Sequence, residues 1–169
     1  MDYKALIRDI HDFPKEGIVF KDITTLWKDP QGLKSSIDEL AEKYKGQGIT
    51  KIVAAEARGF IVGTPLAYAI GAGFVPVRKP GKLPGSTISE TYDLEYGTDT
   101  LTIHDDAIEK GDKVLLVDDL IATGGTLEAS IKMIEKLGGD VVEICVLVEL
   151  EFLNGRSKIS KPVFSLIKY

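Results

Sequence analysis

Residues 114–126 carry the most distinctive reactive groups of this chain, because two adjacent carboxylates, Asp118 and Asp119, precede a loop of glycine and threonine there. Four apolar residues come directly before the acids, and such a run is typical of a strand buried on both faces of a parallel sheet. We expect that strand to end at the acids. Because ligands bind outside the carboxyl ends of strands in open α/β sheets, the stretch predicts a ligand site at one sheet edge.

The loop after the acids suits a phosphate group. Gly124 and Gly125 allow the backbone to turn with its N–H groups inward, and the helix expected from residue 126 adds its positive N-terminal end. The loop lacks the lysine of a Walker-type loop and the glycine spacing of a dinucleotide site, which favours a single terminal phosphate. Carboxylates beside it can accept hydrogen bonds from sugar hydroxyls, so the ligand indicated is a phosphorylated sugar. The residues predicted to hold it are Asp118, Asp119, Ala122, Thr123, Gly124, Gly125 and Thr126.

Each half of this motif also has a structural interpretation, because acids are common at solvated strand ends and Thr-Gly-Gly-Thr can be a turn that caps a helix. The order of all its parts favours the functional one. Residues 114–126 resemble the phosphoribosyl-diphosphate signature of the type I phosphoribosyltransferases. The rest of the chain is most similar to the members of that family that act on adenine, over nearly its whole length.

The resemblance implies an α/β fold with a central, mainly parallel sheet flanked by helices. It also implies a small N-terminal hood over about residues 1–30 and a flexible β-ribbon lid over about residues 78–104. The implied reaction, a step of purine salvage, moves the 5-phosphoribosyl group of phosphoribosyl diphosphate to adenine and gives AMP and diphosphate. Its implied cofactor is Mg²⁺, held through substrate and water with no protein ligand assigned, and the implied assembly is a homodimer.

Length and composition limit the remaining choices. The chain has 169 residues, 44% hydrophobic and 28% charged, which predicts a single globular domain over residues 1–169. A net charge of −5 argues against non-specific nucleic-acid binding, and no run of about 20 apolar residues predicts a membrane span. The single cysteine, Cys145, lies in an apolar run and is expected to be buried. These features, with no signal-like N-terminal run, favour a cytoplasmic protein.

Strand-like and helical patterns alternate along the chain, as expected for a parallel sheet with helical crossovers. Leu6, Ile7 and Ile10 indicate a first short helix, and Asp29-Pro30 can start a helix whose inner face carries residues 33, 37, 40 and 44. The other predicted elements are strands at residues 49–55, 74–77, 114–117, 141–148 and 163–167, helices at residues 60–70 and 126–137, and ribbon strands near residues 92–96 and 100–103.

A second loop is expected at the same sheet edge, formed by Glu56, Ala57 and Arg58 after the strand at residues 49–55. An arginine fork matches phosphate oxygens, although a Glu–Arg pair can also be an ordinary surface pair. The resemblance implies that this loop binds diphosphate, with Glu56 holding its shape and Arg58 touching the substrate. The basic run at residues 78–82 can be a solvated face. The resemblance implies instead that Arg78, Lys79 and Lys82 neutralise the diphosphate, in some members across a dimer interface.

Residues 17–24 would be a core strand by composition alone. The resemblance implies a base-binding segment, in which Phe20 stacks on the purine and the backbone near Val19 reads its edge; such stacking is worth roughly 1–3 kcal/mol per base. Lys21 stands where many adenine-specific relatives carry arginine. Within the ribbon, Glu95 is the implied acid/base for a purine ring proton and Tyr96 the implied cover, although an exposed ribbon explains both residues equally well.

Two other functions remain open at this point. One is a non-enzymatic regulator that binds phosphoribosyl diphosphate and controls transcription, for which the chain lacks an added nucleic-acid-binding module. The other is transfer to xanthine or hypoxanthine, which the Asp118-Asp119 pair disfavours and Lys21 leaves open. His11, His104 and Cys145 are too few and too scattered for a zinc or iron site.

Overall fold

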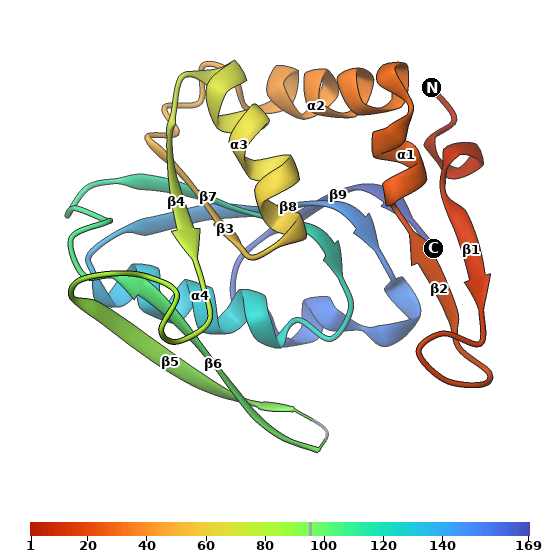
Figure 1. The fold of residues 1–169 in the computed structure, drawn as a ribbon. Helices are drawn as coiled ribbons and strands as arrows, with labels where there is room; N and C mark the ends of the chain where they lie inside the picture. Colours follow the sequence, from red (N-terminus) through yellow and green to blue (C-terminus); the bar gives the residue numbers. More distant parts are fainter. Residues whose placement is uncertain (95) are drawn as a thin grey trace.

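The structure is a computed structural model that describes residues 1–94 and 96–169. Its centre is a five-stranded sheet with the strand order β4-β3-β7-β8-β9 (Figure 1). Every neighbouring pair in this sheet is parallel, so the predicted fold class is confirmed. The strands are β3 (Lys51–Ala55), β4 (Gly73–Val77), β7 (Lys113–Ile121), β8 (Asp140–Glu149) and β9 (Val163–Lys168).

Helices cover both faces of the sheet. Helices α2 (Pro30–Tyr44) and α3 (Arg58–Ile70) lie on one face, and α4 (Gly125–Lys136) lies on the other (Figure 1). Because side chains alternate along a strand, Leu115 of β7 joins the apolar cluster beneath α2 and α3 while Leu116 joins the cluster beneath α4. A strand buried on both faces needs apolar residues at every position, which explains the continuous run in the sequence.

The helix predicted from Asp29-Pro30 is confirmed as α2. The Asp29 carboxylate accepts a hydrogen bond from the Gly32 backbone N–H at 2.6 Å, and Pro30 takes the first helical position. Leu40 and Tyr44 are buried on its inner face. Local signals at the helix start and the spacing of its apolar residues were therefore sufficient to predict this element.

Two antiparallel pairs lie outside the sheet. The strands β1 (Arg8–His11) and β2 (Val19–Asp22) form a hairpin on the side of the molecule where β8 and β9 end, and β5 (Thr87–Leu94) and β6 (Gly97–His104) form a long ribbon that passes along α4 (Figure 1). The ribbon predicted within residues 78–104 is therefore present. The remaining elements are α1 (Thr24–Lys28) and three short 3₁₀ turns, η1 (Tyr3–Leu6), η2 (Glu151–Leu153) and η3 (Gly155–Lys158).

The N-terminal segment differs from its prediction. The helix expected around Leu6, Ile7 and Ile10 is a single turn, η1, that ends at Leu6, and Ile10 lies in β1 opposite Phe20. Pairing with β2 therefore overrides the apolar spacing. Residues 17–24 do not form a core strand either, because β1 is the one strand among the described residues that pairs with β2, and Val19 is left 42% exposed.

Strand β7 is longer than its apolar run and does not end at the acids. It continues to Ile121 because the ten-residue strand β8 goes on pairing with it, with Asp118 opposite Val146 and Leu120 opposite Val148. On its other side, the pairing with β3 stops at Val117. The two acids therefore lie inside a strand but beyond its last residue pair with β3, so no strand pairs with them on that side. Within the described residues, no helix is both long enough and apolar enough to cross a membrane.

Candidate active site

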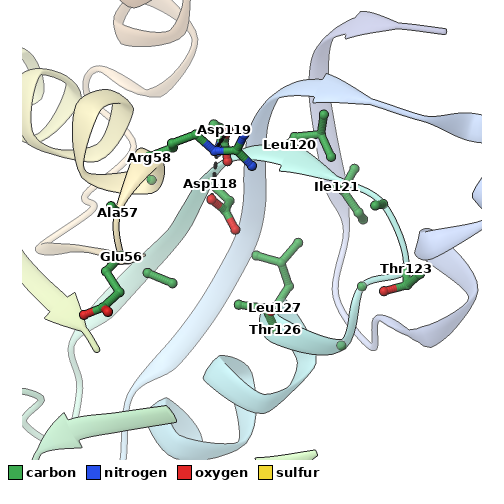
Figure 2. Close-up of a pocket in the computed structure, with 15 residues that line it drawn as sticks. Glu56, Ala57, Arg58, Asp118, Asp119, Leu120, Ile121, Thr123, Thr126 and Leu127 are labelled. Carbon is green, nitrogen blue, oxygen red and sulfur yellow. Dashed lines mark hydrogen bonds and ion pairs between the residues drawn. The ribbon is translucent and has the colours of Figure 1, made fainter. Parts of the chain in front are cut away.

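Both predicted loops line one pocket of about 280 Å³ (Figure 2). One loop follows β3 and the other follows β7, and these strands are parallel neighbours, so their carboxyl ends meet at the same edge of the sheet. The sequence-predicted residues that line this pocket are Glu56, Ala57, Arg58, Asp118, Asp119, Ala122, Thr123, Gly124, Gly125 and Thr126.

The Asp118 side chain points into the space between the start of α3 and the start of α4 (Figure 2). Its Oδ1 accepts a hydrogen bond from the Asp119 backbone N–H at 2.9 Å. Helix α3 approaches closely because Gly59 has no side chain; a Cβ there would lie 3.0 Å from the same oxygen. Burial, and then the neighbouring charge of Asp119, raise the pKa of Asp118 well above its usual range.

Asp119 is only 4% exposed, and its Oδ2 lies 3.0 Å from Arg58 Nε in an ion pair (Figure 2). The orientation of the two groups does not make a hydrogen bond, and no polar group of the described residues donates one to this buried oxygen. A buried carboxylate oxygen without a donor is unfavourable. The arrangement therefore leaves an acceptor for a ligand hydroxyl or a cation.

The loop after β7 presents backbone amides at the start of α4. Gly124 is buried with a φ of +88°, in the left-handed region that favours glycine, and among the described residues no side chain caps the helix. The free N–H groups and the positive end of the helix together favour an anion. The Thr126 hydroxyl lies 3.1 Å from the Tyr92 hydroxyl of the ribbon, while Thr123 is exposed.

The predicted lid cations do not line this pocket. Arg78 Nε donates to Glu56 Oε2 at 2.6 Å, Lys79 pairs with Asp99 of the ribbon, and Lys82 is exposed. Glu56 turns away from the acids (Figure 2), and its bond to Arg78 ties the loop to the strand end after β4.

The side chains of the predicted base-binding segment lie on opposite faces of the hairpin. The Phe20 ring faces Arg58, whose guanidinium carbon lies 5.9 Å from the ring centroid. Val19 and Lys21, on the opposite face of β2, line a second pocket of about 530 Å³. Lys21 Nζ lies 2.7 Å from Asp9 Oδ1 and 4.2 Å from the centroid of the Tyr169 ring.

Several residues that line this second pocket were not predicted from the sequence. His11, Leu150, Phe152 and Tyr169 contribute to its wall together with Asp9. Two of them could have been found from their position in the sequence. Leu150 and Phe152 follow the apolar run of β8, so they must lie at the same sheet edge as the loop after β7. The chain terminus and the hairpin meet there only through the tertiary fold.

Three further predictions concern individual residues. Glu95 lies outside the described residues, and Tyr96 beside it at the end of the ribbon is 86% exposed. Cys145 is fully buried in β8, as predicted. Among the described residues, no three His, Cys, Asp or Glu side chains are grouped so as to hold a metal ion.

A family model for the phosphoribosyl transferase domain matches residues 27–168, and the chain belongs to this family. The resemblance found in residues 114–126 is therefore confirmed. Several relatives that match this chain over nearly its whole length are adenine phosphoribosyltransferases. The one from Geotalea daltonii is 58% identical over 169 residues, covering 99% of each chain.

Solved structures agree with this assignment. The adenine phosphoribosyltransferase of Thermoanaerobacter pseudethanolicus matches with a TM-score of 0.95 and 55% identity, over 99% of this chain and 98% of that one. The enzyme of Saccharomyces cerevisiae, complexed with an imino-altritol bisphosphate and adenine, matches with a TM-score of 0.92 and 43% identity, over 98% and 96% of the two chains.

Proposed function

We propose that this protein transfers the 5-phosphoribosyl group of phosphoribosyl diphosphate to adenine, giving AMP and diphosphate in purine salvage. The observation that carries the proposal is the convergence of the glycine loop, the two acids and Arg58 on one pocket. The names of its full-length relatives supply the base, adenine.

In this proposal the amides of the loop and the hydroxyls of Thr123 and Thr126 hold the 5-phosphate. Asp118 and Asp119 accept hydrogen bonds from the ribose hydroxyls, and their charge offsets the positive charge that develops at the anomeric carbon. Arg58 binds the leaving diphosphate through its fork. Arg58 now lies 3.0 Å from Asp119, but its side chain is about half exposed, so it can exchange this contact for one with a substrate oxygen.

The donor set of the pocket fits a Mg²⁺ ion. Mg²⁺ prefers oxygen ligands, and commonly takes one or two carboxylates together with substrate phosphates. Asp118 and Asp119 supply carboxylate oxygens, and Asp119 Oδ2 is buried without a hydrogen-bond donor among the described residues. When bound, the ion would neutralise charge on the diphosphate, and it would be held mainly through substrate and water.

The proposed base subsite is the face of the Phe20 ring that lies against Arg58 of the first pocket. The Val19 and Lys21 side chains line the second pocket, on the opposite face of β2. Stacking on the Phe20 ring and hydrogen bonds to the backbone near Val19 suit a base that carries no charge. When adenine attacks the sugar, its ring proton must leave, and we assign Glu95 as the acceptor and Tyr96 as a cover over the reacting centre.

Other parts of the proposal concern the assembly. We propose one domain over residues 1–169, with residues 1–30 as the hood and residues 78–104 as a lid whose closure brings Arg78, Lys79 and Lys82 to the diphosphate and excludes water. Ile61 and Tyr68 lie seven residues apart on one face of α3 and are 44% and 91% exposed, which supports α3 as part of a homodimer interface. A cytoplasmic location is in keeping with the single buried thiol of Cys145.

The experiment that tests this function is an incubation of the protein with Mg²⁺, phosphoribosyl diphosphate and one free base at a time. AMP should form from adenine, at a much higher kcat/KM than nucleotide forms from hypoxanthine or xanthine. Faster transfer to either 6-oxopurine would replace adenine as the substrate. No transfer to any base, with phosphoribosyl diphosphate still bound, would favour a regulator.

A further inference from the structure

The phosphate loop contacts a segment from the far end of the chain. Gly155, the first residue of η3, is buried although its neighbours on both sides are partly or fully exposed. A Cβ at Gly155 would lie 2.5 Å from the Ala122 carbonyl oxygen, and a Cβ at Gly124 would lie 2.6 Å from the Gly155 carbonyl oxygen. Real Cβ atoms do not approach so closely, so the two backbones can meet only because both residues are glycine.

An arginine holds η3 in this place. Arg156 binds Glu149 with both arms of its fork, through Nε at 2.5 Å and Nη2 at 2.7 Å, and its Nη1 donates to the Val163 carbonyl oxygen at 2.5 Å. Glu149 is 4% exposed and is the last residue of β8. A bidentate pair fixes orientation as well as distance.

The anchor and the loop share one sheet edge. Glu149 lies in register with Ile121, the last residue of β7, and the Leu150 N–H donates to the Ile121 carbonyl oxygen at 3.1 Å. The loop from Ala122 onward therefore has its start fixed by β8, and its backbone at Ala122 and Gly124 lies against Gly155. Its position depends on Arg156 as well as on its own sequence.

We propose that Gly155 and Arg156 are positioning residues for the 5-phosphate of the sugar substrate. This inference rests on the proposed function, because it takes the loop at residues 122–126 as the phosphate site. Neither residue lines the pocket. They hold the backbone amides of the loop in position, so that the N–H groups can donate to the phosphate oxygens without rearrangement of the loop. A misplacement of about 1 Å in such a site can cost on the order of 100-fold in rate.

The first test is Gly155→Ala. The Ala122 carbonyl must then retreat by at least about 0.5 Å to reach the 3.0 Å that real Cβ contacts allow. We expect the KM for phosphoribosyl diphosphate to rise about tenfold or more, while the KM for adenine stays within about twofold. The matched control is Gly73→Ala, at the far end of the sheet, where the new Cβ would meet the flexible side chain of Lys51 at 3.2 Å and the Thr50 carbonyl oxygen at an ordinary contact distance of 3.7 Å.

The second test is Arg156→Lys, which keeps the charge opposite Glu149 and loses the fork. It should raise the same KM by a smaller factor, and ribose 5-phosphate binding measured by calorimetry should weaken in parallel in both variants. If the unfolding temperature of both variants falls but their affinity for ribose 5-phosphate stays at the wild-type value, the two residues are only structural and the inference is wrong. Because this binding needs no transfer to a base, it decides the inference even if the wild-type protein fails to make AMP.

Discussion

Replacing Asp118 with asparagine should make the protein more stable and far less active. The residue lines the first pocket beside a second carboxylate, and both its burial and the Asp119 charge raise its pKa. Its ionised form is therefore unfavourable in the folded protein. Asparagine has almost the same shape and no charge, so the variant removes this cost and keeps the packing against Gly59.

The sign and size of the effect follow from the pKa. Because the folded protein holds the Asp118 proton to a higher pH than the unfolded chain does, the free energy of unfolding falls as pH rises above about 3.9, the unfolded value. Each unit by which the pKa is raised corresponds to about 1.4 kcal/mol. In a chain of this length, that is roughly 3–6 °C in the unfolding temperature per unit. The gain of Asp118→Asn over wild type should be near zero at pH 4 and grow towards pH 8.

The first assay is thermal unfolding of both proteins without substrate, in EDTA, at pH 4, 6 and 8. The second assay is turnover with Mg²⁺, adenine and phosphoribosyl diphosphate at pH 8. The matched control is Asp106→Asn, at an exposed position, which should change neither quantity. Turnover of Asp118→Asn should fall by at least two orders of magnitude, as for the loss of other groups that stabilise charge in a transition state. A variant that is less stable at pH 8 than wild type, or that keeps its turnover, would refute this reasoning.

Three further predictions concern the phosphate loop, base choice and metal. Gly124→Val should weaken binding of phosphoribosyl diphosphate, measured by calorimetry, by on the order of 100-fold. The φ of Gly124 is +88°, and a Cβ there would lie 2.6 Å from the Gly155 carbonyl oxygen; unchanged affinity would reject this placement of the phosphate. Asp9→Asn should leave the ratio of kcat/KM for adenine and hypoxanthine unchanged, because Lys21, now 2.7 Å from Asp9, lies on the face of β2 opposite Phe20; a ratio that shifts towards hypoxanthine would show that Lys21 faces the base. EDTA should abolish AMP formation, with full recovery on adding Mg²⁺, and leave the unfolding temperature of the substrate-free protein unchanged; turnover that persists in EDTA would exclude the ion from the reaction.

Much of the fold could be predicted from the sequence because its signals are local. The apolar run at residues 114–117 and the capped start of α2 each depend on residues close in the chain, so the first residues of β7 and of α2 were predicted to within one residue. Prediction failed where the length or type of an element depends on the strand that pairs with it. The length of β7 is set by β8, and Ile10 lies in a strand because of β2. Propensity and spacing do not include such long-range pairing.

Short stretches of the sequence are enough to identify the available chemical groups: two carboxylates, a glycine loop and an arginine, each next to the end of an apolar strand. The tertiary structure brings these groups into one pocket, because β3 and β7 are neighbours in the sheet although about sixty residues separate them in the chain. It alone placed Lys21 against Asp9 and Gly155 against Gly124. Such contacts arise when distant segments pack on one core, and no local pattern of residues encodes them.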